Sequence, residues 1–165
     1  MAGEASFDVV SDFDEQELRN ALDQVRREVQ QRYDFKGVTV DLEQSKEELT
    51  LLTEDEYKAS AVKDLIESKA IRRNLSLKIF DWGIIEPAGG STVRQKVGLR
   101  RGLPEDVAKK ISKMIRDDFP KAKSQIQGDA VRVSSKSRDE LQKVIGRLRE
   151  ESEALPVALQ FENYR

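Results

Sequence analysis

Apolar residues along this chain follow two rhythms, an alternation at every second residue and a recurrence every three to four residues. The alternation is typical of half-buried strands, and the longer period is typical of helices with one buried face. The first half predicts a strand at residues 7–11, a helix at 14–32, strands at 38–42 and 49–51, a helix at 56–73 and a strand at 75–79. The second half predicts a strand at 93–99, a helix at 104–119, a hairpin at 122–127 and 130–135, a helix at 138–149 and a strand at 157–161.

Each half therefore has the order strand, helix, strand, strand, helix, strand. This is the split βαβ order of ferredoxin-like domains, so we predict an α+β protein with two ferredoxin-like (βαββαβ) domains and antiparallel sheets. The boundary between the two passes lies near residues 84–91, where Pro87-Ala-Gly-Gly90 interrupts both rhythms. In such a domain both helices cover one face of the sheet, and the other face is free for a partner or for the other half of the chain.

The composition removes several classes of chemistry. The 165 residues include no cysteine and no histidine. Disulfides and thiolate chemistry are therefore excluded, and the commonest general base and transition-metal ligand is missing. No apolar run reaches the roughly 20 residues that a membrane span needs, and the N-terminus lacks the layout of a signal peptide. We expect a cytoplasmic, monomeric protein that is not an enzyme and has no catalytic residues, cofactor or metal site.

The net charge of −2 hides an uneven distribution along the chain. Residues 1–60 hold 7 Lys and Arg against 16 Asp and Glu, whereas residues 94–149 hold 16 against 7. The basic stretch is compatible with an anionic partner. Attraction between the two halves of the protein explains the same distribution equally well.

The stretch from Gln125 to Gln142 carries the clearest candidate chemistry. It predicts a strand, a Gly-Asp turn, a second strand, and then a helix start flanked by Lys136 and Arg138. A helix start offers backbone donors and a positive dipole end, so two cations beside it suit an anion such as phosphate. Ser137 and Glu140 also fit a capping box, and for Ser137 taken alone we favour this structural interpretation.

Alternation in the hairpin assigns its side chains to the two faces of a sheet. The residues expected on the helix side are Ile126, Val131 and Val133. The candidates expected on a free face are Gln125, Gln127 and Arg132 in the hairpin, with Arg94 and Lys96 on the strand at 93–99. Amides and guanidinium groups there suit a base edge and a phosphate, although a polar interface between two sheets is an equal alternative. An RNA-recognition sheet usually displays stacking aromatics, and this hairpin has none.

The aromatic residues are expected to be mainly structural. We predict that Tyr33 and Phe35 anchor in the core, that Phe161 is buried and that Tyr164 packs at an interface. Phe80 and Trp82 could stack on a purine, but for an aromatic at a strand end the edge of the core is the favoured interpretation.

Four segments of the chain resemble the YajQ family of bacterial proteins, and they span the chain in the family's order. They are Ser6-Phe-Asp-Val-Val-Ser11, Arg32-Tyr-Asp-Phe-Lys-Gly37, Gln125-Ile-Gln-Gly-Asp129 running into Lys136-Ser-Arg-Asp-Glu-Leu-Gln142, and Gln160-Phe-Glu-Asn-Tyr-Arg165. The resemblance implies two ferredoxin-like domains that exchange their N-terminal strands. The first domain would be residues 12–100, including the strand at 91–100, and the second would combine 1–11, with its strand at 6–11, and 101–165. The family is described as nucleotide-binding, with some members reported to bind cyclic di-GMP and others RNA or GTP.

Our leading hypothesis is a non-enzymatic protein that binds a guanine nucleotide, such as cyclic di-GMP, between or on the two sheets. The nucleotide-binding candidates are Arg94, Lys96, Gln125, Gln127, Arg132, Lys136 and Arg138. Binding would change the surface shown to a downstream protein partner. The alternative is RNA binding by the basic second half, which predicts that affinity falls steeply with salt. A magnesium-dependent hydrolase is the weakest hypothesis, because no spaced pair of carboxylates stands out.

Overall fold

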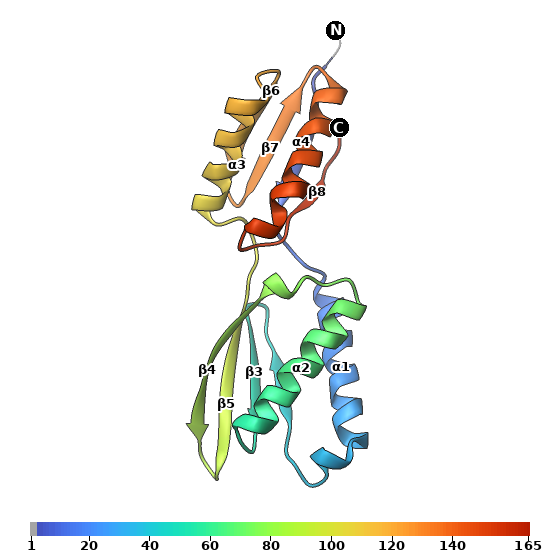
Figure 1. The fold of residues 1–165 in the computed structure, drawn as a ribbon, viewed down its shortest axis with the longest axis vertical. Helices are drawn as coiled ribbons and strands as arrows, with labels where there is room; N and C mark the ends of the chain where they lie inside the picture. Colours follow the sequence, from blue (N-terminus) through green and yellow to red (C-terminus); the bar gives the residue numbers. More distant parts are fainter. Residues whose placement is uncertain (1–2) are drawn as a thin grey trace. The chain divides into compact units, whose positions relative to one another are not determined.

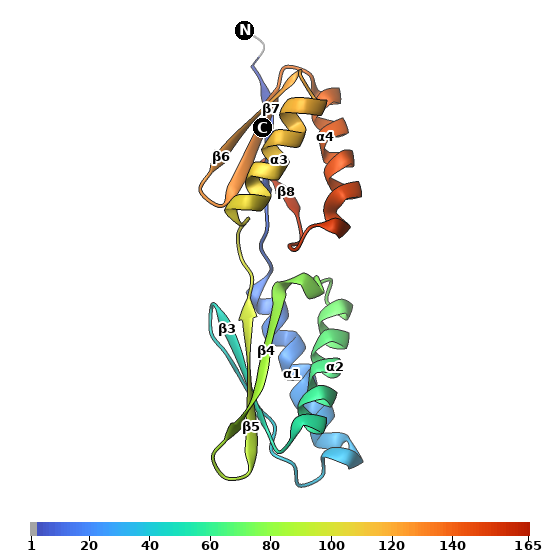
Figure 2. The same cartoon turned by 60° about the vertical axis from the view of Figure 1, so that its left-hand side comes forward.

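The chain folds into two units, each with its own sheet and its own hydrophobic core. The computed structural model describes residues 3–165. Unit 1 comprises the chain up to Asp12 together with Arg101–Arg165, and unit 2 is Phe13–Arg100. Within each unit, two helices cover one face of a four-stranded antiparallel sheet (Figure 1 and Figure 2). The predicted α+β class with two ferredoxin-like domains is confirmed.

Unit 2 has the sheet order β2-β3-β5-β4. Its elements are α1 (Glu15–Gln31), η1 (Tyr33–Phe35), β2 (Asp41–Gln44), β3 (Glu48–Thr53), α2 (Glu56–Arg72), η2 (Leu77–Ile79), β4 (Phe80–Ala88) and β5 (Thr92–Leu99). The helices bury aliphatic side chains against the sheet, among them Leu22 on α1, Ile66 on α2 and Val97 on β5, each fully buried. The three- to four-residue period of α1 and α2 is thus explained by one shared core.

Unit 1 has the sheet order β6-β7-β1-β8. Its elements are β1 (Ala5–Val10), α3 (Glu105–Asp118), β6 (Ala122–Gln127), β7 (Ala130–Ser135), α4 (Arg138–Glu151), η3 (Ser152–Ala154) and β8 (Gln160–Glu162). The first strand of the chain lies between β7 and β8, antiparallel to both. Likewise β5, the strand that would begin a second half, lies between β3 and β4 in unit 2. Each unit therefore takes a central strand from the other half of the sequence.

Two features of the local pattern have a different meaning in the structure. The Pro87–Gly90 stretch, which marks the boundary between the two passes of the sequence, lies inside unit 2, where it closes the hairpin between β4 and β5. Gly90 and Ser91 take the positive φ angles, 68° and 62°, that let the chain reverse there. The alternating residues 75–79 do not form a strand. Ser76 caps a 3-10 turn by accepting a hydrogen bond from the Lys78 N–H, and the strand begins at Phe80.

The aromatic residues divide between core and surface differently from the prediction. Phe35 is buried as expected, at 3% exposure, but Tyr33 is 89% exposed. The Phe35 ring takes the core position at this corner, with the Arg32 guanidinium 5.3 Å and the Lys58 ammonium 5.1 Å from its centroid. Phe161 is only partly buried, edge-on to Phe7 at 5.8 Å.

No helix within residues 3–165 is long and apolar enough to cross a membrane.

Candidate functional site

The predicted free face of the hairpin exists in unit 1. Cross-strand pairing aligns Gln125 on β6, Arg132 on β7, Asp8 on β1 and Glu162 on β8 in one row. Side chains of such directly paired residues lie on the same face of the sheet. This face is the one without helices, because the alternate residues Val131 and Val133 are buried in the core on the other face. Gln125 and Gln127 are exposed there, and the Gln127 amide donates to the Gln125 oxygen at 3.4 Å.

Arg132 is already engaged by an acid on this face. Its Nε donates to Asp8 Oδ1 at 2.9 Å, and the Asn163 amide donates to Asp8 Oδ2 at 2.8 Å. The hydrogen bond from Arg132 holds the pKa of Asp8 below its ordinary value; the Asn163 hydrogen bond and the charge of Arg165 act in the same direction, against the effect of burial. A phosphate would have to displace Asp8 to reach Arg132, so this residue is a weak ligand candidate.

The three helix-side residues lie on the predicted face, because Ile126 is paired directly with Val131. Val131 and Val133 are fully buried beneath α3 and α4, and Ile126 stays 42% exposed because it lies on the outer strand β6.

The start of α4 is capped by Ser137, as its sequence indicated. Ser137 Oγ accepts a hydrogen bond from the Glu140 N–H at 3.2 Å. The second half of a capping box is supplied differently, because the Ser137 N–H donates to Ser135 Oγ at 3.0 Å. Lys136 and Arg138 flank this cap, and both side chains are exposed. Neither forms an ion pair within the part of the chain that the structure describes.

Arg138 lines a hollow of about 230 Å³ on the side of α4 that faces β1 and the C-terminal segment. Polar residues that share this hollow include Ser6 on β1, Gln142, one turn further along α4, and Arg165. Tyr164 also lines it, and its ring is 59% exposed and packs on Phe7 at 6.1 Å. The main chain of Arg165 is fixed in place, since it exchanges hydrogen bonds of 3.0 and 3.1 Å with Ser6 on β1.

The hollow combines three properties that a nucleotide needs. Arg138 and Arg165 carry positive charge, and the N-terminal end of a helix adds a positive partial charge beside Arg138. The Gln142 amide offers a donor and an acceptor to a base edge. The exposed Tyr164 ring offers a surface on which a base can stack. Sequence reasoning missed Gln142, Tyr164 and Arg165 as a group, because nothing in the local pattern shows that the C-terminal segment returns to the start of α4.

Arg94 and Lys96 belong to unit 2, whereas the other five predicted ligands belong to unit 1. Both are exposed on β5, on the face without helices. Arg94 is paired across the sheet with Glu86 on β4 and Lys96 with Thr50 on β3. The predicted residues thus form three groups: the β5 pair, the hairpin face and the α4 start.

The charge imbalance along the sequence does not become an imbalance between units. Unit 1 holds 14 Lys and Arg against 14 Asp and Glu, and unit 2 holds 15 against 17. The basic stretch is neutralised because unit 1 also contains the acidic segment up to Asp12 and the acidic end of the chain. Any site for an anion in unit 1 therefore depends on local groups, and not on the net charge of the unit.

Comparison with known proteins adds to this geometry. A family model described as nucleotide-binding protein YajQ-like matches residues 5–165. The chain is 58% identical to a protein of Chloroflexus aggregans, 54% to one of Roseiflexus castenholzii and 53% to one of Thermosynechococcus vestitus. Each similarity extends over 165 residues and covers the whole of both chains, and each of these relatives is named a nucleotide-binding protein.

Proposed function

The chain belongs to the YajQ-like family of nucleotide-binding proteins, and on that premise we propose that it binds a guanine nucleotide without catalysing a reaction. One observation carries the choice of site. Arg138, which has no ion pair within residues 3–165, shares a hollow with Arg165, the Gln142 amide and the exposed ring of Tyr164. The two arginines would each meet a phosphate, as a dinucleotide such as cyclic di-GMP offers.

Electrostatics favours this hollow over a larger one in unit 2. A cavity of about 860 Å³ beside α1 is also lined by cations, but its Arg26 and Arg32 are paired with Asp23 and Asp34 at 2.7 Å. Charge-assisted contacts to phosphate are strongest where the guanidinium is not already satisfied by a carboxylate. The smaller hollow meets this condition through Arg138.

The base would be read by an amide and held by stacking. Gln142 can accept from guanine N1–H with its oxygen and donate to O6 with its nitrogen. Adenine has an acceptor at N1 and a donor at N6, the opposite of guanine, so the Gln142 amide would have to rotate by half a turn to bind adenine. Stacking on Tyr164 contributes to either base equally.

The test is calorimetric titration of the whole protein with cyclic di-GMP, GTP, ATP and a short single-stranded RNA, at low and at physiological salt. We expect a guanine nucleotide to bind. Arg138→Glu should lower the affinity for this nucleotide by at least about tenfold, since a charge-assisted hydrogen bond is replaced by repulsion. The melting temperature should stay unchanged, because the Arg138 side chain forms no ion pair with any of residues 3–165. Lys113→Glu is the matched control, an exposed lysine on α3, and should leave the affinity unaltered.

Ser137→Ala separates the structural role of this region from binding. It should lower stability by about 1 kcal/mol through loss of the helix cap, while the nucleotide affinity changes little. If Ser137→Ala abolished binding and Arg138→Glu did not, the α4 start would be a structural feature and the proposed site would be wrong.

RNA binding is the second candidate, favoured by the exposed amides of Gln125 and Gln127 on the helix-free face of unit 1. It predicts binding only by the RNA and a steep loss of affinity with salt, because several counterions are released. A nucleotide with two phosphates would show a much shallower dependence. Binding of the RNA alone, insensitive to Arg138→Glu, would move the function to this face.

A further inference from the structure

The two units have the same order of elements but differ where the first helix meets the outermost strand. In unit 1 the connection from α3 to β6 is three residues long, and Ser112 Oγ on α3 lies 2.7 Å from Ser124 Oγ on β6. In unit 2 the connection from α1 to β2 spans residues 32–40 and includes η1. The cavity of about 860 Å³ is lined by α1, this connection and β2, and we call this region of unit 2 the seam. The same pair of elements is thus joined closely by the serine contact in unit 1, whereas a cavity lies beside it in unit 2.

The open seam exposes the edge of a sheet. β2 is the outermost strand of its sheet and is only four residues long. The Ser45 N–H donates to the Glu48 oxygen at 2.8 Å and the Glu48 N–H donates to Ser45 Oγ at 3.1 Å, so these residues face each other in the position of a hydrogen-bonded pair. Because such pairs alternate along an antiparallel ladder, the backbone groups of Leu42 and Gln44 point away from β3. Arg26 Nη2 donates to the Leu42 oxygen at 2.6 Å, which agrees with this outward direction.

The floor of the seam is aliphatic. Val29 on α1 and Leu42 on β2 are 8% and 6% exposed, and Val38 and Val40 are half-buried against the same core. Apolar side chains at alternate positions of an extended chain would fit such a floor, because one face of a strand carries every second residue.

The charges of the seam are balanced, which argues against a phosphate ligand. Arg26 is paired with Asp23, Arg32 with Asp34, and Asp41 and Glu43 line the cavity as well. Among the cations of the lining, Lys36 differs from the two arginines, since its exposed ammonium has no ion pair within the described residues. A single carboxylate on a bound chain would complement it.

We infer that this seam binds an extended peptide segment of a partner protein, which adds to the edge of β2 as a fifth strand. Its backbone pairs with Leu42 and Gln44, its apolar side chains cover Val38 and Val40, and one acidic side chain meets Lys36. Addition of a strand to an exposed edge is a common mode of peptide recognition. In the free protein, Arg26 occupies the Leu42 oxygen and so protects a short edge from unwanted pairing; the peptide replaces this contact.

The decisive variant is Gln44→Pro. Proline lacks the N–H that the added strand must receive, and its ring obstructs the incoming chain. Within the protein, this N–H faces away from β3, and proline is tolerated at such positions of edge strands. The side-chain oxygen of Gln44 is buried without a hydrogen-bond partner among the described residues, so its removal sacrifices no internal bond.

The experiment pans a random octapeptide phage library on the whole protein and measures the recovered sequences as labelled peptides by fluorescence anisotropy. We expect enriched peptides with alternating apolar residues and an acid, bound at least about tenfold more weakly by Gln44→Pro. Lys36→Glu should weaken them about fivefold, as loss of one exposed ion pair predicts, and Lys113→Glu on α3 should not. Amide exchange at Leu42 should slow when the peptide is present.

Two results would overturn the inference: no peptide enriched on the wild-type protein, or enriched peptides that bind Gln44→Pro and Lys36→Glu with unchanged affinity. If Gln44→Pro does not give a cooperative melt, Lys36→Glu and the Leu42 exchange measurement decide the outcome, because Lys36 is exposed and its replacement leaves the core intact. Nucleotide titration of both variants should be normal, which distinguishes this seam from the site at α4.

Discussion

The alternating pattern predicts that the Asp8 side chain is exposed, but in the structure its hydrogen-bond partners cover it. It lies on the helix-free face of unit 1, yet the residue is only 7% exposed. Arg132 and Asn163 cover it and donate to both carboxylate oxygens at 2.9 and 2.8 Å. A buried carboxylate is stable only when it is paired and hydrogen-bonded in this way. Arg132, which the sequence suggested as a nucleotide-binding residue, thus serves to stabilise Asp8.

Asp8→Asn should destabilise the protein by about 2 kcal/mol at pH 7, the range of hydrogen bonds to a charged group. Because the pKa of Asp8 is lowered in the folded state, its stabilisation is fully present above the unfolded pKa and is lost as the pH falls through the folded one. The difference between the wild type and Asp8→Asn should therefore be constant from pH 7 to about 5 and shrink below about pH 4.

Urea denaturation at a series of pH values measures this difference. Glu162→Gln is the control, because Glu162 is paired with Asp8 across the strands but is exposed. A difference that stays constant down to pH 3 would show that the charge of Asp8 contributes nothing.

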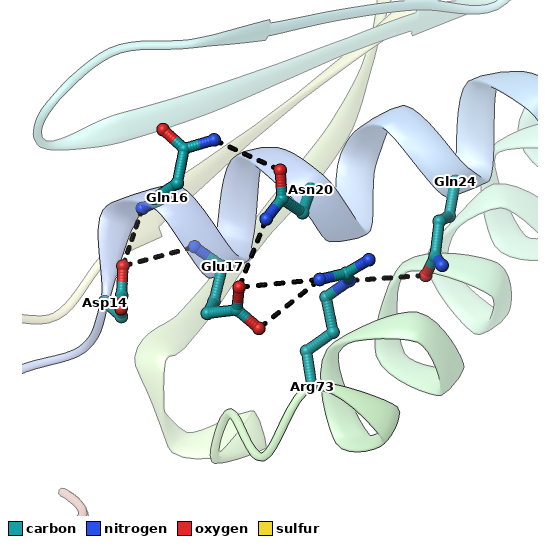
Figure 3. A network of polar contacts seen from close by, with 6 residues as sticks. All are labelled: Asp14, Gln16, Glu17, Asn20, Gln24 and Arg73. Carbon is teal, nitrogen blue, oxygen red and sulfur yellow. Dashed lines mark hydrogen bonds and ion pairs between the residues drawn. The ribbon is translucent and has the colours of Figure 1, made fainter.

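Among the elements, α1 is fixed at its start by two kinds of polar contact of unequal strength (Figure 3). Asp14 Oδ1 accepts hydrogen bonds from the Gln16 and Glu17 N–H groups at 2.9 and 3.2 Å. Further along, Arg73 at the end of α2 donates to Glu17 and Gln24 at 3.4 Å. The first contact satisfies orphan donors of the helix, whereas the second joins two partly exposed side chains across the helices.

Asp14→Ala should therefore cost about 1 kcal/mol of unfolding free energy, as the loss of an N-cap does. Arg73→Met, which keeps the aliphatic part of the side chain, should cost less, about 0.5 kcal/mol. Equilibrium urea unfolding of the two variants gives the comparison. A larger loss of stability in Arg73→Met than in Asp14→Ala would mean that the contacts of Arg73 with Glu17 and Gln24, and not the cap, stabilise this end of unit 2.

At the scale of the whole molecule, the chain passes from one unit to the other twice, after Asp12 and after Arg100. Unit 2 is continuous in sequence and contains all four of its strands and its core. Unit 1 is discontinuous, because its central strand β1 is separated from the rest by the whole of unit 2. The two units should therefore respond differently to truncation.

A fragment of residues 13–100 should fold alone, with a cooperative thermal transition by circular dichroism and a dispersed amide spectrum. A fragment of residues 13–90, cut at the sequence's apparent boundary, should be unfolded, because it lacks β5 between β3 and β4. Residues 101–165 should likewise fail to fold without β1. A cooperative transition in the 13–90 fragment would contradict the observed strand order.

Local pattern was sufficient to predict the helices and most of the strands, because hydrophobic period and turn residues act over a few residues, although residues 75–79 form a 3-10 turn and not a strand. The four helices and the hairpin at 122–127 and 130–135 follow directly from the chain, and the order of elements identifies the ferredoxin-like fold. Periodicity could not show that the first strand joins the second sheet, and only the family resemblance implied it. The hollow that joins Arg138 to Arg165, the engagement of Arg132 by Asp8 and the open seam beside β2 all depend on contacts between distant segments. Such contacts are fixed by packing and strand pairing between segments far apart in the chain, so they become visible once the chain is folded.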